Sequence, residues 1–275
     1  MFRSPLILAA CLFLTMHCPA QEPKGIQDNS FLVEESYNQE AGVVQEINFF
    51  SWSPTTHSWL YTFTNEWPVN GIKHQFSYSL SGVRNGDFGG AGFGDAALNY
   101  RYQLVGSGDT RVAVSPRFTL VLPTGDPRTG RGSGGTGYQT NIPASIMLHP
   151  KLAMHLNAGA TWVPHAKNEL GERAGVAGYN LGQSFIWLAN PRFNVMMETF
   201  FNDTDIVAAP GKTVRQRDLL LSPGFRWAYN FESGLQIVPG VAFPFGAGPT
   251  AGEKSVIFYL SFEQPLKILN WQKKK

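Results

Sequence analysis

Apolar and polar residues alternate along most of this chain after residue 40, in segments of about ten residues that end in turns. In one such segment Trp59, Tyr61 and Phe63 share one face, whereas Thr62 and Thr64 share the other. A period of two residues indicates a β-strand with one apolar and one polar face. The pattern predicts about twelve strands, with ten and fourteen as alternatives. They cover residues 43–53, 59–68, 73–83, 93–105, 111–123, 137–149, 152–163, 176–189, 193–203, 215–230, 234–246 and 254–264.

The turns between these segments alternate in length. Short turns fall at 68–71, 106–109, 149–151, 190–192 and 231–234. Longer loops are expected at 84–92, 124–136, 164–175, 203–213 and 246–254. Short turns on one side and long loops on the other are typical of barrels in the bacterial outer membrane. The sequence therefore predicts an all-β fold, a transmembrane antiparallel up-and-down β-barrel over residues 43–265, rather than a soluble β-sandwich or a soluble barrel.

Aromatic residues gather toward the ends of the expected strands, where a membrane barrel has its interfacial girdles. The girdle candidates are Trp52, Trp59, Trp67, Tyr138, Trp162, Trp187, Trp227 and Tyr229.

Four prolines fall inside expected strands, at Pro116, Pro143, Pro223 and Pro239. Proline cannot donate to the strand ladder, and a closed barrel has no edge to place it on. We therefore expect bulges or local gaps at these positions.

The two ends of the chain differ from the middle. Residues 1–20 have a basic start, a short apolar run and small residues before a cleavage site. This pattern predicts a secretory signal peptide. Both cysteines, Cys11 and Cys18, lie within it, so the exported chain would have no thiol chemistry. Residues 21–42 are either a periplasmic lead-in or a short plug segment, drawn as a helix at the periplasmic mouth. Residues 266–275 form a basic tail.

Composition narrows the function classes. A formal net charge of +2 with no clustered basic face gives no indication of nucleic-acid binding. The glycines of 132–137 fit a dinucleotide fingerprint by letters, but a strand follows where a helix is needed, so no cofactor is expected. The histidines lack metal-ligand spacing on one strand face, so no metal is expected either.

Charged residues on the polar faces are the strongest functional signal. An arginine facing lipid at the midplane costs roughly 2–4 kcal/mol, so these side chains should face the lumen. They form either a constriction that selects solutes by charge or a salt-bridge network that fills a narrow barrel. Asp95 and Glu66 are the expected carboxylate partners of Arg101 and Arg117. The lumen and selectivity candidates are Glu66, Asp95, Arg101, Arg117, Glu198, Arg226 and Glu263.

Several phrases of the sequence resemble a known family. They are residues 28–35 with 37–40, residues 59–68, Gly94-Asp95 before 98–102, and residues 122–126. Together they resemble the bacterial outer-membrane proteins grouped as meta-pathway phenol-degradation transporters, over about residues 28–264. The resemblance implies an outer-membrane barrel that moves small solutes, aromatic or hydrophobic compounds among them.

The sequence thus predicts a passive channel in the cell outer membrane, not an enzyme, whose partners are membrane lipid, a small-molecule solute and the barrel assembly machinery. One alternative is a lumen-filled structural or adhesive barrel without transport, for which long Gly-rich loops would be contact surfaces. A lipid-modifying barrel enzyme is the other alternative, and its one hint is His57 beside Ser58, with no orienting acid to name.

Overall fold

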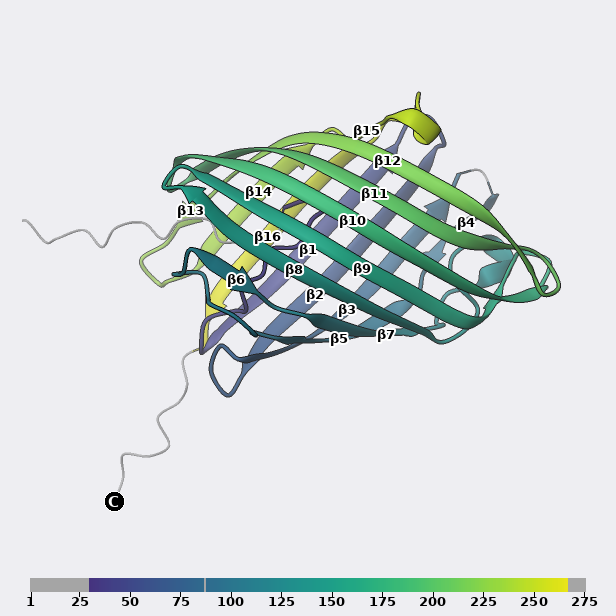
Figure 1. Cartoon of the computed structure of the whole chain (residues 1–275), viewed down its shortest axis with the longest axis horizontal. Helices are drawn as coiled ribbons and strands as arrows, with labels where there is room; N and C mark the ends of the chain where they lie inside the picture. The colour runs from purple at the N-terminus through teal and green to yellow at the C-terminus, as the bar shows by residue number, and fades with distance from the viewer. Residues whose placement is uncertain (1–29, 87, 267–275) are drawn as a thin grey trace, which may run out of the picture.

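The structure, a computed structural model, describes residues 30–86 and 88–266, so the expected signal peptide and nearly all of the basic tail lie outside the described residues (Figure 1). The segments are β1 (Val43–Ser53), β2 (Ser58–Val69), β3 (His74–Asn85), β4 (Phe88–Phe93), β5 (Ala96–Tyr102), β6 (Val112–Val114), β7 (Arg117–Leu122), β8 (Gly137–His149), β9 (Leu152–Lys167), β10 (Arg173–Asn190), β11 (Phe193–Ala209), β12 (Lys212–Trp227), β13 (Tyr229–Asn230), β14 (Gln236–Ala242), β15 (Phe245–Gly246) and β16 (Val256–Pro265). Two short 3-10 helices, η1 (Pro127–Thr129) and η2 (Gly248–Thr250), lie in long loops.

The strands close into one antiparallel barrel. β1 pairs with β2 on one side and with β16 on the other, and β14 joins β16 to β12, so the ladder has no open end. Four strands of the barrel are each divided into two segments by a short break. The divided strands are β4 with β5, β6 with β7, β12 with β13, and β14 with β15. The described residues therefore form a barrel of twelve strands, as predicted.

The loops differ from the expectation in three places. Residues 84–92 are not a long loop, because β3 and β4 pair up to Asn85 and Phe88. Residues 164–175 and 203–213 are not long loops, because the neighbouring strands keep pairing until Lys167 meets Arg173 and Ala209 meets Lys212. Figure 1 shows β9 to β12 extending as long hairpins at the end of the barrel that carries the long loops. At the opposite end Asn70 and Gly71 both have positive φ, which these two residues tolerate well in a tight turn.

Each strand proline borders a gap in the ladder. Pro116 lies in the break between β6 and β7, and Pro143 of β8 lies opposite that break. Pro223 lies opposite the break between β14 and β15, and Pro239 lies near the break at Ala228. The missing N–H donors thus fall where the ladder is already interrupted, which is the expected kind of local gap.

The two faces of the barrel have opposite chemistry. Exposed large apolar side chains such as Leu98, Phe118 and Phe258 point outward, whereas buried polar and charged side chains such as Asn99, Glu198 and Ser261 point inward. This arrangement is that of a transmembrane barrel with a polar lumen. In the part of the chain that the structure describes, no helix is long and apolar enough to cross a membrane.

Residues 30–40 run inside the barrel, and we call them the lumen segment. It has bends but no helix between residues 30 and 42. Polar and apolar members alike are buried, among them Phe31, Val33, Glu35 and Ser36. Phe31 joins the apolar cluster inside the barrel, which also contains Ile47, Ile186, Met196 and Tyr259.

Candidate functional site

Glu198 of β11 holds the first part of the lumen segment. One carboxyl oxygen, Oε1, accepts from the backbone N–H groups of Leu32 at 2.9 Å and Val33 at 3.1 Å, and Oε2 accepts from Phe31 at 3.2 Å. The Glu198 side chain is 0% exposed. The bends of the lumen segment leave its backbone N–H groups without partners inside the segment. The Glu198 carboxyl group therefore accepts three hydrogen bonds that the carbonyls of a neighbouring strand would otherwise accept.

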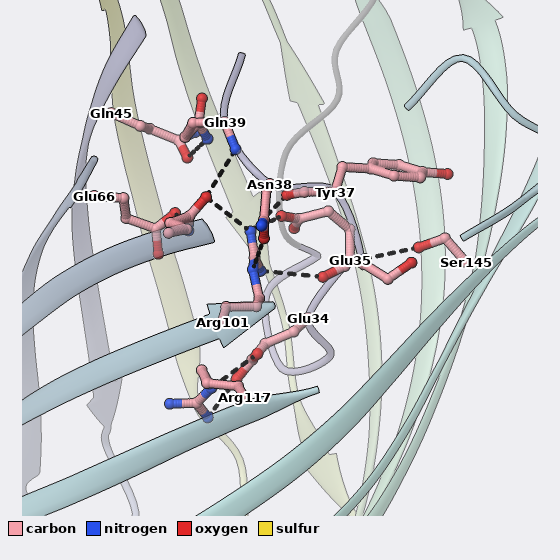
Figure 2. A network of polar contacts seen from close by, with 12 residues as sticks. Glu34, Glu35, Tyr37, Asn38, Gln39, Gln45, Glu66, Arg101, Arg117 and Ser145 are labelled. Carbon is pink, nitrogen blue, oxygen red and sulfur yellow. Dashed lines mark hydrogen bonds and ion pairs between the residues drawn. The ribbon is translucent and has the colours of Figure 1, made fainter. Parts of the chain in front are cut away.

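Arg101 of β5 holds the second part. Its guanidinium donates to the backbone carbonyls of Glu35 and Tyr37 and to the side chains of Asn38 and Gln75, and it pairs with the Glu35 carboxylate at 3.5 Å. Figure 2 shows Arg101 at the centre of this network, between Glu66 and Glu35. All three nitrogens of the guanidinium therefore already have protein partners.

Arg117 of β7 makes a second ion pair with the segment. Its Nε donates to Glu34 Oε2 at 3.1 Å, and its Nη2 pairs with Glu34 Oε1 (Figure 2). The other donors of Arg117 reach Asn99, Thr119 and Gln139 on β5, β7 and β8. Unlike Arg101, this pair is half-buried, since 19% of the arginine side chain and 26% of the glutamate side chain are exposed.

Further hydrogen bonds fix the course of the segment across the lumen. Gln39 N–H donates to Gln75 of β3, Ser36 N–H donates to Ser145 of β8, and Glu34 N–H donates to Asn157 of β9. The Ser30 hydroxyl lies 2.9 Å from that of Ser184 in β10. The segment thus passes from the β3–β5 wall to the β10–β12 wall.

A cavity of about 300 Å³ remains between the segment and the opposite wall. Its polar lining includes the hydroxyl-bearing residues Thr62, Thr64, Ser77 and Ser79 of β2 and β3. Its apolar lining includes Phe31, Leu32, Ile47, Phe49 and Tyr259, and Ile47 and Phe49 of β1 lie directly beside Thr64 and Thr62. Glu66, Gln75 and Arg101 lie at its end toward the short turns, so the charged network forms the floor of the cavity.

The predicted lumen residues do not form one ring. Arg101, Glu198, Arg226, Glu66 and Glu263 are buried inside the barrel, and Arg226 lies close enough to Glu198 to attract it electrostatically. Glu66 accepts from Gln75 Nε2 at 2.7 Å.

Asp95 has a different role from the one expected. Its carboxylate accepts from Gly125 N–H, Ser133 N–H and the Ser133 hydroxyl, at 2.7–3.0 Å. The expected pairing of Asp95 with Arg101 and Arg117 is therefore wrong. The two arginines instead form ion pairs with carboxylates of the lumen segment, and the expected partner Glu66 attracts Arg101 electrostatically. Asp95 ties the loop at 124–136 to the barrel.

Sequence reasoning missed the residues of the lumen segment that complete the site, Glu34, Glu35 and Asn38. Their signal is an acidic pair ahead of the first strand, but no period links them to residues more than sixty positions away. Gln75 and Asn157 had a usable signal, because both lie on the polar faces of predicted strands.

The residues considered for lipid chemistry lie elsewhere. His57 lies in the turn between β1 and β2 with a φ of 51°, and Ser58 begins β2, where its hydroxyl bonds that of Thr56. The aromatic girdle candidates lie on the barrel exterior, most exposed at Trp162, Trp187 and Tyr229.

Comparison with known proteins supports this fold. A search of curated proteins finds no match. Among solved structures, the chain is similar to the COG4313 outer membrane channel from Pseudomonas putida F1, with a TM-score of 0.58, 12% identity, and coverage of 83% of this chain and 97% of that one. It is also similar to the NanC porin, with a TM-score of 0.55, 10% identity, and coverage of 79% and 98%. Residues 22–258 match the family model described as "Putative MetA-pathway of phenol degradation", and the chain belongs to that family.

Proposed function

We propose that this barrel is a passive outer-membrane channel for small solutes, including aromatic or hydrophobic compounds. The cavity beside the lumen segment is the observation that carries the proposal. Its volume of about 300 Å³ is at the small end of ligand pockets, which suits a solute with one ring. Its mixed polar and apolar lining suits a solute with both kinds of surface. Family membership and the fold of a named outer membrane channel support the same function.

The lumen segment serves as a plug in this proposal. Arg101 and Glu198 hold it mainly through its backbone, so their charges position the constriction. Arg117 and Glu34 line the cavity and are partly exposed, so this pair is our candidate for selecting solutes by charge.

Transport is tested by reconstituting the refolded barrel in liposomes and in planar bilayers. We expect ion conductance and entry of phenol into barrel-containing liposomes above the rate for empty liposomes. A heat-modifiable, folded barrel that conducts nothing and admits no phenol would remove the proposal.

The second candidate is a structural or adhesive barrel. It is favoured by the way the lumen segment fills the β8–β12 side of the lumen, where Val33 approaches Gly182 and Phe31 approaches Gly224. The same liposome experiment decides between the two, because a filled barrel would add no permeability at any solute size.

Two partners complete the proposal. The exposed apolar exterior and its aromatic residues would contact outer-membrane lipid. The barrel assembly machinery would insert the chain, and depletion of that machinery in cells should leave the protein unfolded and degraded.

A further inference from the structure

Phe31 packs against two glycines of the barrel wall. A Cβ added at Gly224 would lie 2.5 Å from Phe31 Cε2, and one added at Gly240 would lie 3.0 Å from Phe31 Cε1 and Cζ. Tyr259 meets the same ring edge to face, with ring centroids 6.0 Å apart. We call the surface formed by Gly224, Gly240 and Tyr259 the ring seat.

The backbone does not require glycine at these two positions. Neither Gly224 nor Gly240 has positive φ, and both lie within paired strands, where glycine weakens a sheet. Glycine inside a strand often marks a place where another group approaches the backbone closely. A Cβ at Gly224 would also lie 2.9 Å from Ala242 Cβ, and one at Gly240 would lie 3.0 Å from Arg226 Cβ, so the two glycines allow both the close strand pairing and the approach of the ring.

The ring seat is continuous with the cavity. Phe31 and Tyr259 line the cavity together with Phe49 and the hydroxyl-bearing residues Thr62 and Thr64. Only noncovalent contacts hold the Phe31 ring in the ring seat. When the lumen segment moves and this ring leaves, another ring of similar size can take its place. Edge-to-face contact with Tyr259 is available to any aromatic ring but gives a saturated ring no comparable attraction.

We propose that the ring seat is a binding site for a single aromatic ring of the solute, and that Phe31 is its intramolecular competitor. The inference rests on the proposed function, since it names the solute subsite of the same lumen. An aromatic solute binds the seat only in molecules whose Phe31 ring has left it. The apparent affinity of the solute is therefore its intrinsic affinity multiplied by the fraction of molecules with an empty seat. A hydroxyl on that ring would find partners among the cavity hydroxyls.

The test is equilibrium binding of phenol to the purified, refolded barrel by calorimetry. Phe31→Ala empties the seat and should bind phenol about tenfold or more tightly than the unmodified chain. Tyr37→Ala is the matched control, because it removes an aromatic ring from the same segment at a place where that ring packs against His155 and does not line the cavity. It should change phenol affinity less than twofold. Cyclohexanol, similar in size but not aromatic, should gain little from Phe31→Ala.

A second variant fills the seat again. In the Phe31→Ala background, Gly240→Val places side-chain atoms where the ring lay, so the gain in phenol affinity should be lost. If Phe31→Ala does not refold to a heat-modifiable barrel, Phe31→Leu carries the test and should show a smaller gain in the same direction.

Equal phenol affinity in Phe31→Ala and Tyr37→Ala, or an equal gain for cyclohexanol, would overturn the ring seat. Phenol entry into liposomes is scored separately on the unmodified barrel. Entry without a gain in binding overturns the ring seat alone, and a gain in binding without entry overturns the proposed channel alone.

Discussion

Glu34 and Arg117 form a two-pronged ion pair across the lumen, which joins the lumen segment to β7 through Nε–Oε2 at 3.1 Å and a second contact from Nη2 to Oε1. The pair lines the cavity and retains partial exposure on both side chains. It is therefore a charged contact of the segment that also faces the path we propose for solutes.

Glu34→Gln should shift the ion preference of the channel toward anions. The substitution keeps an acceptor for Arg117 but removes the negative charge, so the cavity gains one net positive charge. Because partly exposed ion pairs contribute only about 0–1 kcal/mol, the barrel should remain folded. Reversal potential in a salt gradient measures the shift. Glu232→Gln, in an exposed short turn, is the control, and an unchanged reversal potential in Glu34→Gln would show that the pair only holds the segment.

Arg101→Met should release the lumen segment. Glu35 is 1% exposed, and removing the partner of a buried charge costs about 3–5 kcal/mol. The chain avoids this cost by moving Glu35 out of the lumen into water. A glutamate-specific protease should then cut after Glu34 or Glu35, and conductance should rise.

The exposed residue Arg128 supplies the control for this release. It pairs only locally with Asp126, whose pKa it lowers through the side-chain hydrogen bond between them. Arg128→Met should leave protease resistance and conductance unchanged. A resistant segment in Arg101→Met would mean that Glu198 and the other hydrogen bonds suffice to hold it.

Alternation and turn chemistry predicted the wall of the barrel closely. The sequence predicts strands over 43–53 and 137–149, and β1 and β8 have these bounds. A strand ladder repeats the same contact every two residues, so its signal accumulates along a segment. Strand β11 ends later and strand β12 begins earlier than alternation indicated. The alternation of apolar and polar residues stops there, because Asp203, Arg215 and Arg217 on the outward face form ion pairs across the two strands instead of facing lipid.

The contents of the lumen could be predicted only in part. Parity places Glu198 and Arg101 inward, but it does not identify their partners. Phe31 meets Glu198 across 167 positions, and Asn38 meets Arg101 across 63, through single contacts with no repeat. The partners expected for Asp95 are wrong for the same reason, since its hydrogen bonds go to one loop.

Asp95→Ala should loosen the loop at 124–136. Asp95 supplies acceptors for Gly125 and Ser133, so its loss leaves these donors to water and unties the loop from the strand end. Trypsin should then cut after Arg128 or Arg131 within the loop, while the barrel keeps its heat-modifiable mobility. Asp109→Ala, in a short turn, is the matched control. An uncut loop in Asp95→Ala would mean that other contacts of the loop are enough to order it.

A disulfide between residues 30 and 184 should lock the channel. The Ser30 and Ser184 hydroxyls lie 2.9 Å apart, so Ser30→Cys with Ser184→Cys brings two thiols within bonding reach. The described residues contain no other cysteine, so no competing pair forms in the barrel. If the lumen segment must move for solutes to pass, oxidation should reduce phenol entry into liposomes and reduction by dithiothreitol should restore it. The single variant Ser184→Cys controls for the substitution itself and should be insensitive to redox. Equal phenol entry in the oxidised and reduced double variant, with disulfide formation verified by mass, would show that solutes pass through the existing cavity while the segment stays seated.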